Sequence, residues 1–257
     1  KSLKPLPIVK YKDGVAYDKF DDPELRYRQR YVDLVVNDGV KDTFLKRATV
    51  LRTLRKVLDE AGYTEVETPT LQSIAGGASA RPFITHFNAL DQDMYMRIAT
   101  ELYLKRLIVG GFEGVYEIGK NFRNEGMDRN HNPEFTCMEL YVQYKDYNWM
   151  MAFTEKLLET ICIAVNGSPE REIDGKMVSF KAPYRRLPIL DAIKEKTGFD
   201  CNGKTEEEIR AFCLEKGMEV DETFGKGKLI DELFGEFCEG TFIQPTFITD
   251  YPVEMSP

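Results

Sequence analysis

Apolar residues recur along the chain at the spacings typical of helices and strands. Between about residues 42 and 61 they recur every three or four positions, while basic residues lie largely off that line, as in a helix with one buried face. The apolar residues of this stretch are Phe44, Ala48, Leu51, Leu54 and Leu58. Gly62 ends this predicted helix. An earlier helix begins at Asp22-Pro23-Glu24, which supplies a cap and a first-turn proline, and runs to about Asn37.

The same patterns predict the remaining elements. They are a strand at 63–68 that stops at Pro69, a loop at 73–81, a helix at about 101–110 capped by Thr100, strands at about 113–125 and 134–145, a helix at about 147–165, a tight turn at Asp174-Gly175, two or three helices between 188 and 240, and a strand at 247–250. Most strands pair as antiparallel hairpins, with helices before and after them. This order predicts an α+β fold and not a repeated βαβ unit.

Composition narrows the class of protein. The chain has 257 residues, 42% hydrophobic and 30% charged, which is typical of a soluble globular protein. Its net charge of −8 argues against a module that binds nucleic acid mainly through phosphates. No apolar run approaches the roughly 20 residues that span a bilayer, so no membrane association is expected. Five scattered cysteines and two histidines form no zinc or disulfide pattern, which favours reduced thiols in a cytoplasmic protein.

Candidate chemistry lies on the two central strands. Because strand side chains alternate between faces, one face of this pair is apolar and the other carries ionisable and aromatic groups. The second face holds Glu117, Asn121, Arg123 and Glu125 on the first strand and Phe135, Cys137, Glu139 and Tyr141 on the next. An antiparallel sheet with one ordinary solvated face would show the same alternation.

The residue types on that face fit a ligand with phosphate, base and cationic parts. Arg123 can pair with a phosphate through its fixed donor fork, and Phe135 can stack on a flat base. Glu125 can accept from a base amino group, and Glu139 can bind a cation. The loop at 126–132 adds Arg129 and His131, which could reach outer phosphates.

The order of these residues resembles a known family. Phe122-Arg123-Asn124-Glu125, followed by a short loop and the run from His131 to Glu139, resembles motif 2 of class II aminoacyl-tRNA synthetases. The helix at 42–61 with Glu65-Val66-Glu67-Thr68-Pro69 resembles their motif 1. Further runs resemble lysyl-tRNA synthetases in particular, and the likeness covers nearly the whole chain. These runs span residues 26–31, 76–83, 101–106 and 250–254.

The resemblance implies a role for each matching residue. Arg123 would hold the α-phosphate and bridge it to the amino-acid carboxylate as the catalytic residue. The adenine would meet Glu125 and stack on Phe135, with His131 and Asn132 beside the phosphates and base. The lysine pocket would consist of Gly77, Glu101, Glu139 and Tyr141.

The resemblance also implies a domain order. Residues 1–20 would be a linker, or the end of a preceding anticodon-binding barrel, and residues 21–257 a class II catalytic domain, with an antiparallel sheet flanked by helices, that stops before motif 3. The ligands of Mg²⁺ are therefore expected beyond Pro257, no metal ligand is assigned here, and the fragment is expected to be inactive alone. Gly225-Lys226-Gly227-Lys228 lacks the spacing of a phosphate-binding loop.

The expected function is that of a lysine–tRNA ligase in protein biosynthesis. It would use ATP to form lysyl-adenylate and would transfer lysine to tRNA(Lys). Two alternatives stay open: a paralogous ligase that attaches lysine or an analogue to a protein, and a non-catalytic synthetase-like regulator. A homodimer is expected through the helix at 42–62 and the strand that ends at Pro69, with Arg47, Arg52 and Arg55 facing the partner.

Overall fold

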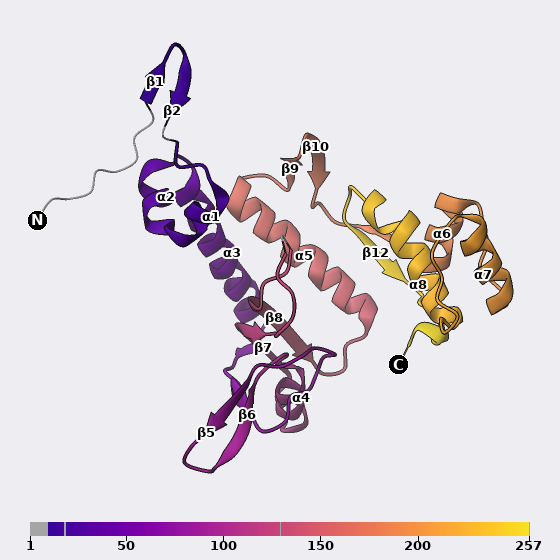
Figure 1. Ribbon diagram of the computed structural model, residues 1–257. Coiled ribbons are helices and arrows are strands. Elements are labelled where there is room, and N and C mark those ends of the chain that lie inside the picture. Colours follow the sequence, from indigo (N-terminus) through magenta and orange to yellow (C-terminus); the bar gives the residue numbers. More distant parts are fainter. Residues whose placement is uncertain (1–9, 18, 129, 257) are drawn as a thin grey trace, which may run out of the picture. The chain divides into compact units, whose positions relative to one another are not determined.

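The computed structural model describes residues 10–17, 19–128 and 130–256 (Figure 1). The chain divides into two compact units, one of residues 1–100 and 116–139 and the other of residues 101–115 and 140–257. Within the stretch expected to be a linker, residues 10–17 form a hairpin of β1 (Lys10–Lys12) and β2 (Val15–Tyr17). Residues 1–9 of that stretch lie outside the described residues.

The helix predicted from Asp22 to Asn37 is two helices, α1 (Pro23–Arg28) and α2 (Arg30–Val36). Its start is confirmed, because Asp22 Oδ1 accepts a hydrogen bond from Leu25 N at 2.8 Å. Its continuity is wrong, because Gln29 departs from helical geometry with φ −120° and ψ 52°.

The break between α1 and α2 is held by a buried carboxylate. Asp33 accepts from Arg26 Nε at 2.8 Å, from Arg30, and from Asn37 Nδ2 at 2.7 Å. These bonds hold the pKa of Asp33 below its ordinary value, the bond from Asn37 contributing most and burial opposing the shift. The periodicity of apolar residues could not reveal this, because the interactions are between polar groups.

The helix predicted at 42–61 is confirmed as α3 (Val40–Glu60). Its second half is buried through Leu54, Val57 and Leu58, whereas Phe44 and Leu45 are 45% and 54% exposed. The apolar stripe on this helix is therefore covered along only part of its length in a single chain.

Two small sheets belong to the first unit or extend from it. The first has the order β3-β7-β8, from β3 (Thr64–Glu65), β7 (Gly114–Phe122) and β8 (Glu134–Val142). The second has the order β4-β6-β5 and is antiparallel, from β4 (Leu71–Gln72), β5 (Ile84–Phe87) and β6 (Gln92–Met96). These strands, with the helices α1–α3, confirm the predicted α+β class.

The second unit contains helices, a hairpin and one parallel strand pair. Its elements are α4 (Glu101–Val109), α5 (Tyr147–Asn166), β9 (Glu170–Ile173), β10 (Lys176–Ser179), β11 (Arg185–Pro188), α6 (Ile189–Thr197), α7 (Glu206–Glu215), α8 (Lys226–Phe237), η1 (Glu239–Thr241), β12 (Thr246–Thr249) and η2 (Val253–Met255). The turn predicted at Asp174-Gly175 joins β9 to β10, as expected. The pairing of β11 with β12 is parallel and departs from the otherwise antiparallel pattern.

The short helix predicted at about 101–110 is confirmed as α4, but its predicted cap is wrong. Thr100 Oγ1 is buried and makes no hydrogen bond in the structure, so it does not close the first turn. Its backbone N–H instead donates to Glu139 Oε1 at 3.3 Å. Thr100 thus contributes a backbone donor to the contact with Glu139, and its hydroxyl does not accept from the first turn of α4.

Gly227, in the discarded Gly-Lys-Gly-Lys run, has a packing role. A Cβ atom at this position would lie 2.0 Å from the carbonyl oxygen of Glu254. Glycine therefore allows the first turn of α8 to touch η2, and Lys226 reinforces the contact through an ion pair with Glu254 at 2.9 Å.

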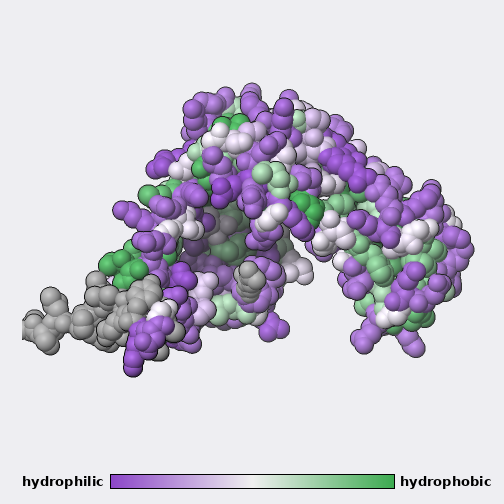
Figure 2. All heavy atoms as spheres, turned by 90° about the horizontal axis from the view of Figure 1, so that it is seen from above, coloured by the Kyte–Doolittle hydropathy of each residue, from purple (hydrophilic) through white to green (hydrophobic). Residues whose placement is uncertain are grey.

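Hydrophilic residues cover most of the face seen in Figure 2. None of the described helices is long and apolar enough to cross a bilayer.

Candidate active site

The two strands predicted to carry the site form the hairpin β7–β8. Arg123 N donates to Pro133 O at 2.9 Å, and Gln143 N donates to Glu113 O at 3.0 Å. These two bonds lie near opposite ends of the hairpin and fit one antiparallel register. In this register Arg123 lies opposite Pro133 and Glu113 lies opposite Gln143, so the numbers of any two paired residues add up to 256. Cross-strand neighbours on each face follow directly from this register.

One face of the hairpin lies against α3. Tyr116 Oη donates to Asp59 Oδ1 of that helix at 2.7 Å, and Arg47 donates to Thr136 Oγ1 at 3.0 Å. The opposite face carries the predicted ligand-binding types, which confirms the alternation expected from the sequence. In the first unit these residues are Glu117, Asn121, Arg123, Phe135, Cys137 and Glu139.

Part of this second face is dry, which removes the ordinary solvated-sheet interpretation for β7. Glu117 is 4% exposed and Asn121 is 1% exposed. Burial raises the pKa of Cys137, Glu139 raises it further, and the charges of Arg123 and Arg97 oppose the rise. The thiol therefore lies within electrostatic reach of both predicted ends of the ligand.

Arg123 and Phe135 form one unit of the face. The guanidinium carbon of Arg123 lies over the ring of Phe135, 5.2 Å from its centroid, so the two groups make a cation–π contact. Arg123 Nε is buried and makes no hydrogen bond in the structure. A planar guanidinium held in this way is preorganised to donate to an anion.

Glu125 lies beside a second backbone segment. Arg81 N donates to Glu125 Oε1 at 3.1 Å, and Asn124 N donates to Arg81 O at 2.7 Å. An open cavity of about 540 Å³ is lined there by Ser79, Ala80, Arg81, Asn124, Glu125 and Gly126. The predicted adenine-binding carboxylate thus lines a cavity large enough for part of a nucleotide.

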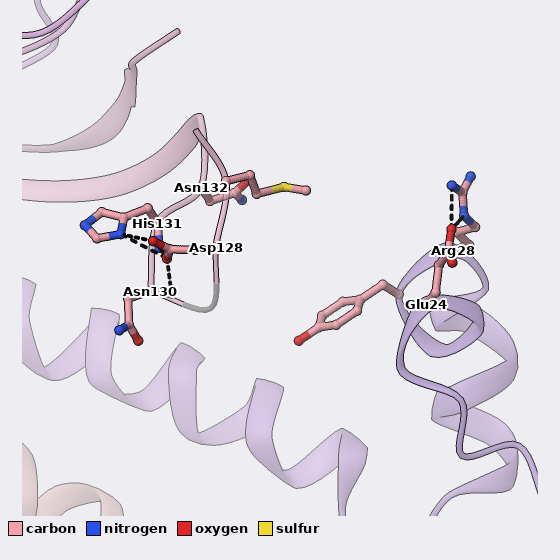
Figure 3. A pocket seen from close by; sticks show the side chains of 8 residues that line it. Glu24, Arg28, Asp128, Asn130, His131 and Asn132 are labelled. Carbon is pink, nitrogen blue, oxygen red and sulfur yellow. Dashed lines mark hydrogen bonds and ion pairs between the residues drawn. The ribbon is translucent and has the colours of Figure 1, made fainter. Parts of the chain in front are cut away.

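His131 and Asn132 lie in the loop between β7 and β8, on one side of a cavity of about 890 Å³ (Figure 3). Asp128 organises this loop by accepting from His131 Nδ1 at 2.8 Å and from the backbone N–H groups of Asn130 and His131 at 2.7 Å. These bonds, that from the His131 side chain first, lower the pKa of Asp128. Residues of α1, including Glu24 and Arg28, line the other side. Arg129 lies outside the described residues.

The residues predicted for the lysine pocket divide between the two units. In the first, Glu139 accepts from Thr100 N, and Gly77 has φ +87° in the loop that follows β4. In the second, Glu101 Oε1 lies 2.5 Å from Lys105 Nζ, and that ammonium lies 5.9 Å from the centroid of the Tyr141 ring. Glu101 and Tyr141 therefore already share an ammonium group from the chain itself.

A family model for class II tRNA synthetases (D, K and N) matches residues 22–257. The chain belongs to this family. Among its curated relatives, the lysine–tRNA ligase of Porphyromonas gingivalis W83 is 65% identical over the whole chain, which covers 44% of that protein. Those of Christiangramia forsetii and Azobacteroides pseudotrichonymphae are 63% and 62% identical over the whole chain, which covers 45% and 51% of them. The chain thus spans about half the length of the curated relatives it matches.

In this class II synthetase domain, the buried side-chain polar atoms that lack a hydrogen-bond partner gather near the site. Among the described residues they are Thr100 Oγ1, Asn121 Oδ1 and Arg123 Nε. Buried polar atoms are nearly always paired, so these three atoms distinguish the surroundings of this face from the rest of the described residues. Thr100 and Asn121 were not predicted as site residues, and only the alternation on β7 pointed toward Asn121.

The described residues contain no group of three or more His, Cys, Asp or Glu side chains that could hold a metal ion. What these residues can do is bind, orient and neutralise charge on organic and phosphate groups.

Proposed function

We propose that this chain is the catalytic core of a lysine–tRNA ligase that activates lysine with ATP and transfers it to tRNA(Lys) in protein biosynthesis. The proposal is supported by relatives of that name, at 62–65% identity over the whole chain. The structural observation that carries it is the shared face of β7–β8. Arg123 and Phe135 lie at one end of this face, and the carboxylate of Glu139 lies at the other.

The ATP end would use residues around the β7–β8 loop. Arg123 would pair with the α-phosphate through its planar donor fork. Phe135 already carries the guanidinium on one side of its ring, so an adenine would stack on the other side. Glu125 retains acceptor capacity beside the Arg81 N–H and would take the adenine amino group, with His131 and Asn132 near the phosphates and base.

The lysine end would use Glu139, Glu101 and Tyr141, with Gly77 supplying backbone contact. An ammonium group taken out of water needs a carboxylate and further acceptors to offset its lost hydration. The contact of Lys105 with Glu101 and Tyr141 supports this assignment, because a side chain with the chemistry of the substrate already binds there.

The reaction would require positioning and charge neutralisation by the protein. An oxygen of the lysine carboxylate forms a bond to the α-phosphorus, the bond to the bridging oxygen breaks, and pyrophosphate leaves. A hydroxyl at the tRNA 3′ end then attacks the lysyl carbonyl, and AMP leaves. Arg123 would stabilise charge on the phosphoryl oxygens, while Glu139 and Phe135 keep the two substrates aligned.

The direct test is lysine-dependent exchange between ATP and pyrophosphate by the full-length protein that contains this chain. We expect exchange with lysine and lysylation of tRNA(Lys). Exchange followed by transfer only to a protein would favour the protein-modifying paralogue. Absence of lysine-dependent exchange in the folded protein would contradict the proposal and favour a non-catalytic regulator.

We also propose a homodimer through α3, on different contacts from those expected. Each arginine predicted to meet the partner has a hydrogen-bond acceptor in its own chain: Thr136 for Arg47, Thr49 for Arg52 and Glu65 for Arg55. The exposed Phe44 and Leu45 at the start of α3 therefore carry the proposal, because apolar side chains are enriched at the centre of dimer interfaces.

Light scattering on the full-length protein tests this association. A dimer mass is expected for the wild type at micromolar concentrations. The Phe44→Asp and Leu45→Asp double variant should shift the mass toward the monomer. The Leu25→Asp variant, which places a charge at another exposed leucine on α1, serves as the control. A monomeric wild type would contradict the proposal, and a dimeric double variant would exclude α3 as its interface.

A further inference from the structure

A buried ion pair lies on the same face of β7 as the proposed substrate contacts. The side chains of Arg97 and Glu117 are each 4% exposed, and Arg97 Nη1 lies 2.5 Å from Glu117 Oε1. Arg97 Nε also donates to the Lys120 carbonyl at 2.8 Å, and Nη1 donates to the Thr68 carbonyl at 3.1 Å. The second oxygen of Glu117 accepts from Thr68 Oγ1 at 2.6 Å. The charge of Glu117 is therefore matched inside the protein.

The backbone of β7 leaves room for this guanidinium. A Cβ atom at Gly119 would lie 2.2 Å from Arg97 Nη2 and 3.1 Å from Glu117 Oε1. The guanidinium of Arg97 occupies the space that a side chain at position 119 would need, so this position requires glycine. Any larger residue would move the guanidinium away from Glu117.

Arg97 begins a buried segment, residues 97–100, whose members are at most 7% exposed. At one end, the carbonyl oxygen of Arg97 accepts from Phe122 N at 2.9 Å, directly before Arg123. At the other end, Thr100 N donates to Glu139 Oε1 at 3.3 Å. Residues 97–100 thus contact two parts of the proposed site. One is the end of β7 directly before Arg123, and the other is the carboxylate of Glu139.

Arg97 also affects which carboxylate faces the substrate. In the register of the hairpin, Glu117 lies opposite Glu139, and directly opposed residues have Cβ atoms about 4.5–5.5 Å apart. Two uncompensated carboxylates at that spacing would compete for the same cation. Because Arg97 pairs with Glu117, that carboxylate does not compete with Glu139 for a cationic ligand.

We infer that Arg97 is a positioning residue of the active site. It neutralises Glu117 and anchors residues 97–100, and so holds in place both the end of β7 beside Arg123 and the carboxylate of Glu139. This inference rests on the proposed function. It concerns a residue that acts through Glu117 and Glu139 without touching the substrate.

The test is ATP–pyrophosphate exchange by the full-length protein and its Arg97→Met variant. We expect kcat to fall on the order of 10²-fold, because small displacements of reacting groups cost about that much. The KM for lysine should fall by about threefold to tenfold, because a cation has been removed and Glu117 left uncompensated beside the ammonium site. Tighter lysine binding with slower chemistry is a result that a simple loss of folded protein does not produce.

Two further variants separate charge from anchoring. In the Arg97→Met/Glu117→Gln double variant the extra negative charge is gone, so the KM for lysine should return to within about threefold of wild type while kcat stays low. Arg97→Lys keeps the charge without the donor fork, and it should keep the KM while lowering kcat. If Arg97→Met fails to fold, Arg97→Lys and Gly119→Ala still test the anchoring through kcat.

A control is the arginine–glutamate pair Arg186 with Glu155 in the second unit, in which Glu155 is 6% and Arg186 35% exposed. Arg186→Met should lower the thermal unfolding midpoint without lowering the KM for lysine. If the wild type is active and Arg97→Met keeps both kcat and the KM for lysine within about threefold of the wild-type values, the inference about Arg97 is wrong. That result would leave the proposed function untouched. The same holds if Arg97→Met and Arg186→Met have the same kinetic effect. A folded wild type without lysine-dependent exchange would overturn the proposed function as well.

Discussion

The bundle of α6–α8 and the site face of β7–β8 are both buried, but they are built from different chemistry. The bundle core consists of apolar side chains and thiols, among them Ile193, Ile209 and Leu233, which are fully buried. The site face buries Arg97, Glu117 and Asn121. All the buried side-chain polar atoms without partners that are found among the described residues, 10–17, 19–128 and 130–256, lie in or beside the site face.

The two regions differ in how burial of their side chains affects the stability of the fold. Burial of an apolar side chain is favourable by itself, whereas a buried polar group is costly unless it is hydrogen-bonded. A region that keeps unpaired polar atoms in a buried place is therefore suited to a ligand that completes the bonds. Mutations in the bundle should act on folding, and mutations on the site face should act on binding and rate.

The largest expected effect concerns substrate choice at the site face. Norleucine lacks the ammonium group of lysine and would give Glu139 and Glu101 no substrate cation, although Glu101 would keep its contact with Lys105. Sites built for hydrogen bonding discriminate against such analogues by about 10⁴-fold or more. Competing exchange assays that compare kcat/KM for the two amino acids measure this ratio. A ratio within about tenfold would mean that these glutamates do not face the ligand.

A smaller effect is expected for Arg123→Ala in the full-length protein. Removal of one preorganised donor to a developing charge lowers the rate by roughly 10²-fold or more. The thermal midpoint should fall only modestly, because the cation–π contact with Phe135 that is lost contributes about 0.5–1 kcal/mol. Exchange kinetics and calorimetry on the same preparation check both parts. Near-wild-type exchange would remove Arg123 from its assigned role.

The converse behaviour is expected of Ile230→Val in the bundle core. Ile230 is fully buried, and removal of one methyl group from such a site lowers the free energy of unfolding by about 0.5–1.5 kcal/mol. Denaturant unfolding measures this loss, while kcat and both KM values should stay within about twofold of wild type. A selective change in the KM for lysine would contradict the separation between the two regions.

The smallest expected effect is that of Lys105→Met. Lys105 pairs with Glu101 four residues earlier and is 56% exposed, and such pairs contribute about 0.3–0.5 kcal/mol. If this internal ammonium competes with lysine, its removal should lower the KM for lysine by no more than about twofold. A rise in the KM would show that Lys105 supports the pocket and does not compete with the substrate.

Much of the fold could be predicted because it depends on local periodicity. The helices at 42–61 and 147–165 correspond closely to α3 and α5 (Tyr147–Asn166), and the hairpin at 113–145 has its predicted faces. Failures occurred where polar groups from other segments intervene. The buried Asp33 accompanies a break in the first helix, and Thr100 contacts Glu139 through its backbone N–H while its hydroxyl makes no capping bond.

The sequence by itself determined the α+β class, the family and the residue types on the site face, because these depend on alternation and on the order of neighbouring residues. Only the tertiary structure decided how those residues are partnered. In the sequence, Arg97 is a single charged residue within a largely apolar run. In the structure, its guanidinium donates to four acceptor atoms, which belong to residues 68, 117 and 120. Hydrogen bonds and ion pairs are short-range and join segments that are distant in sequence, so no periodicity along the chain encodes them.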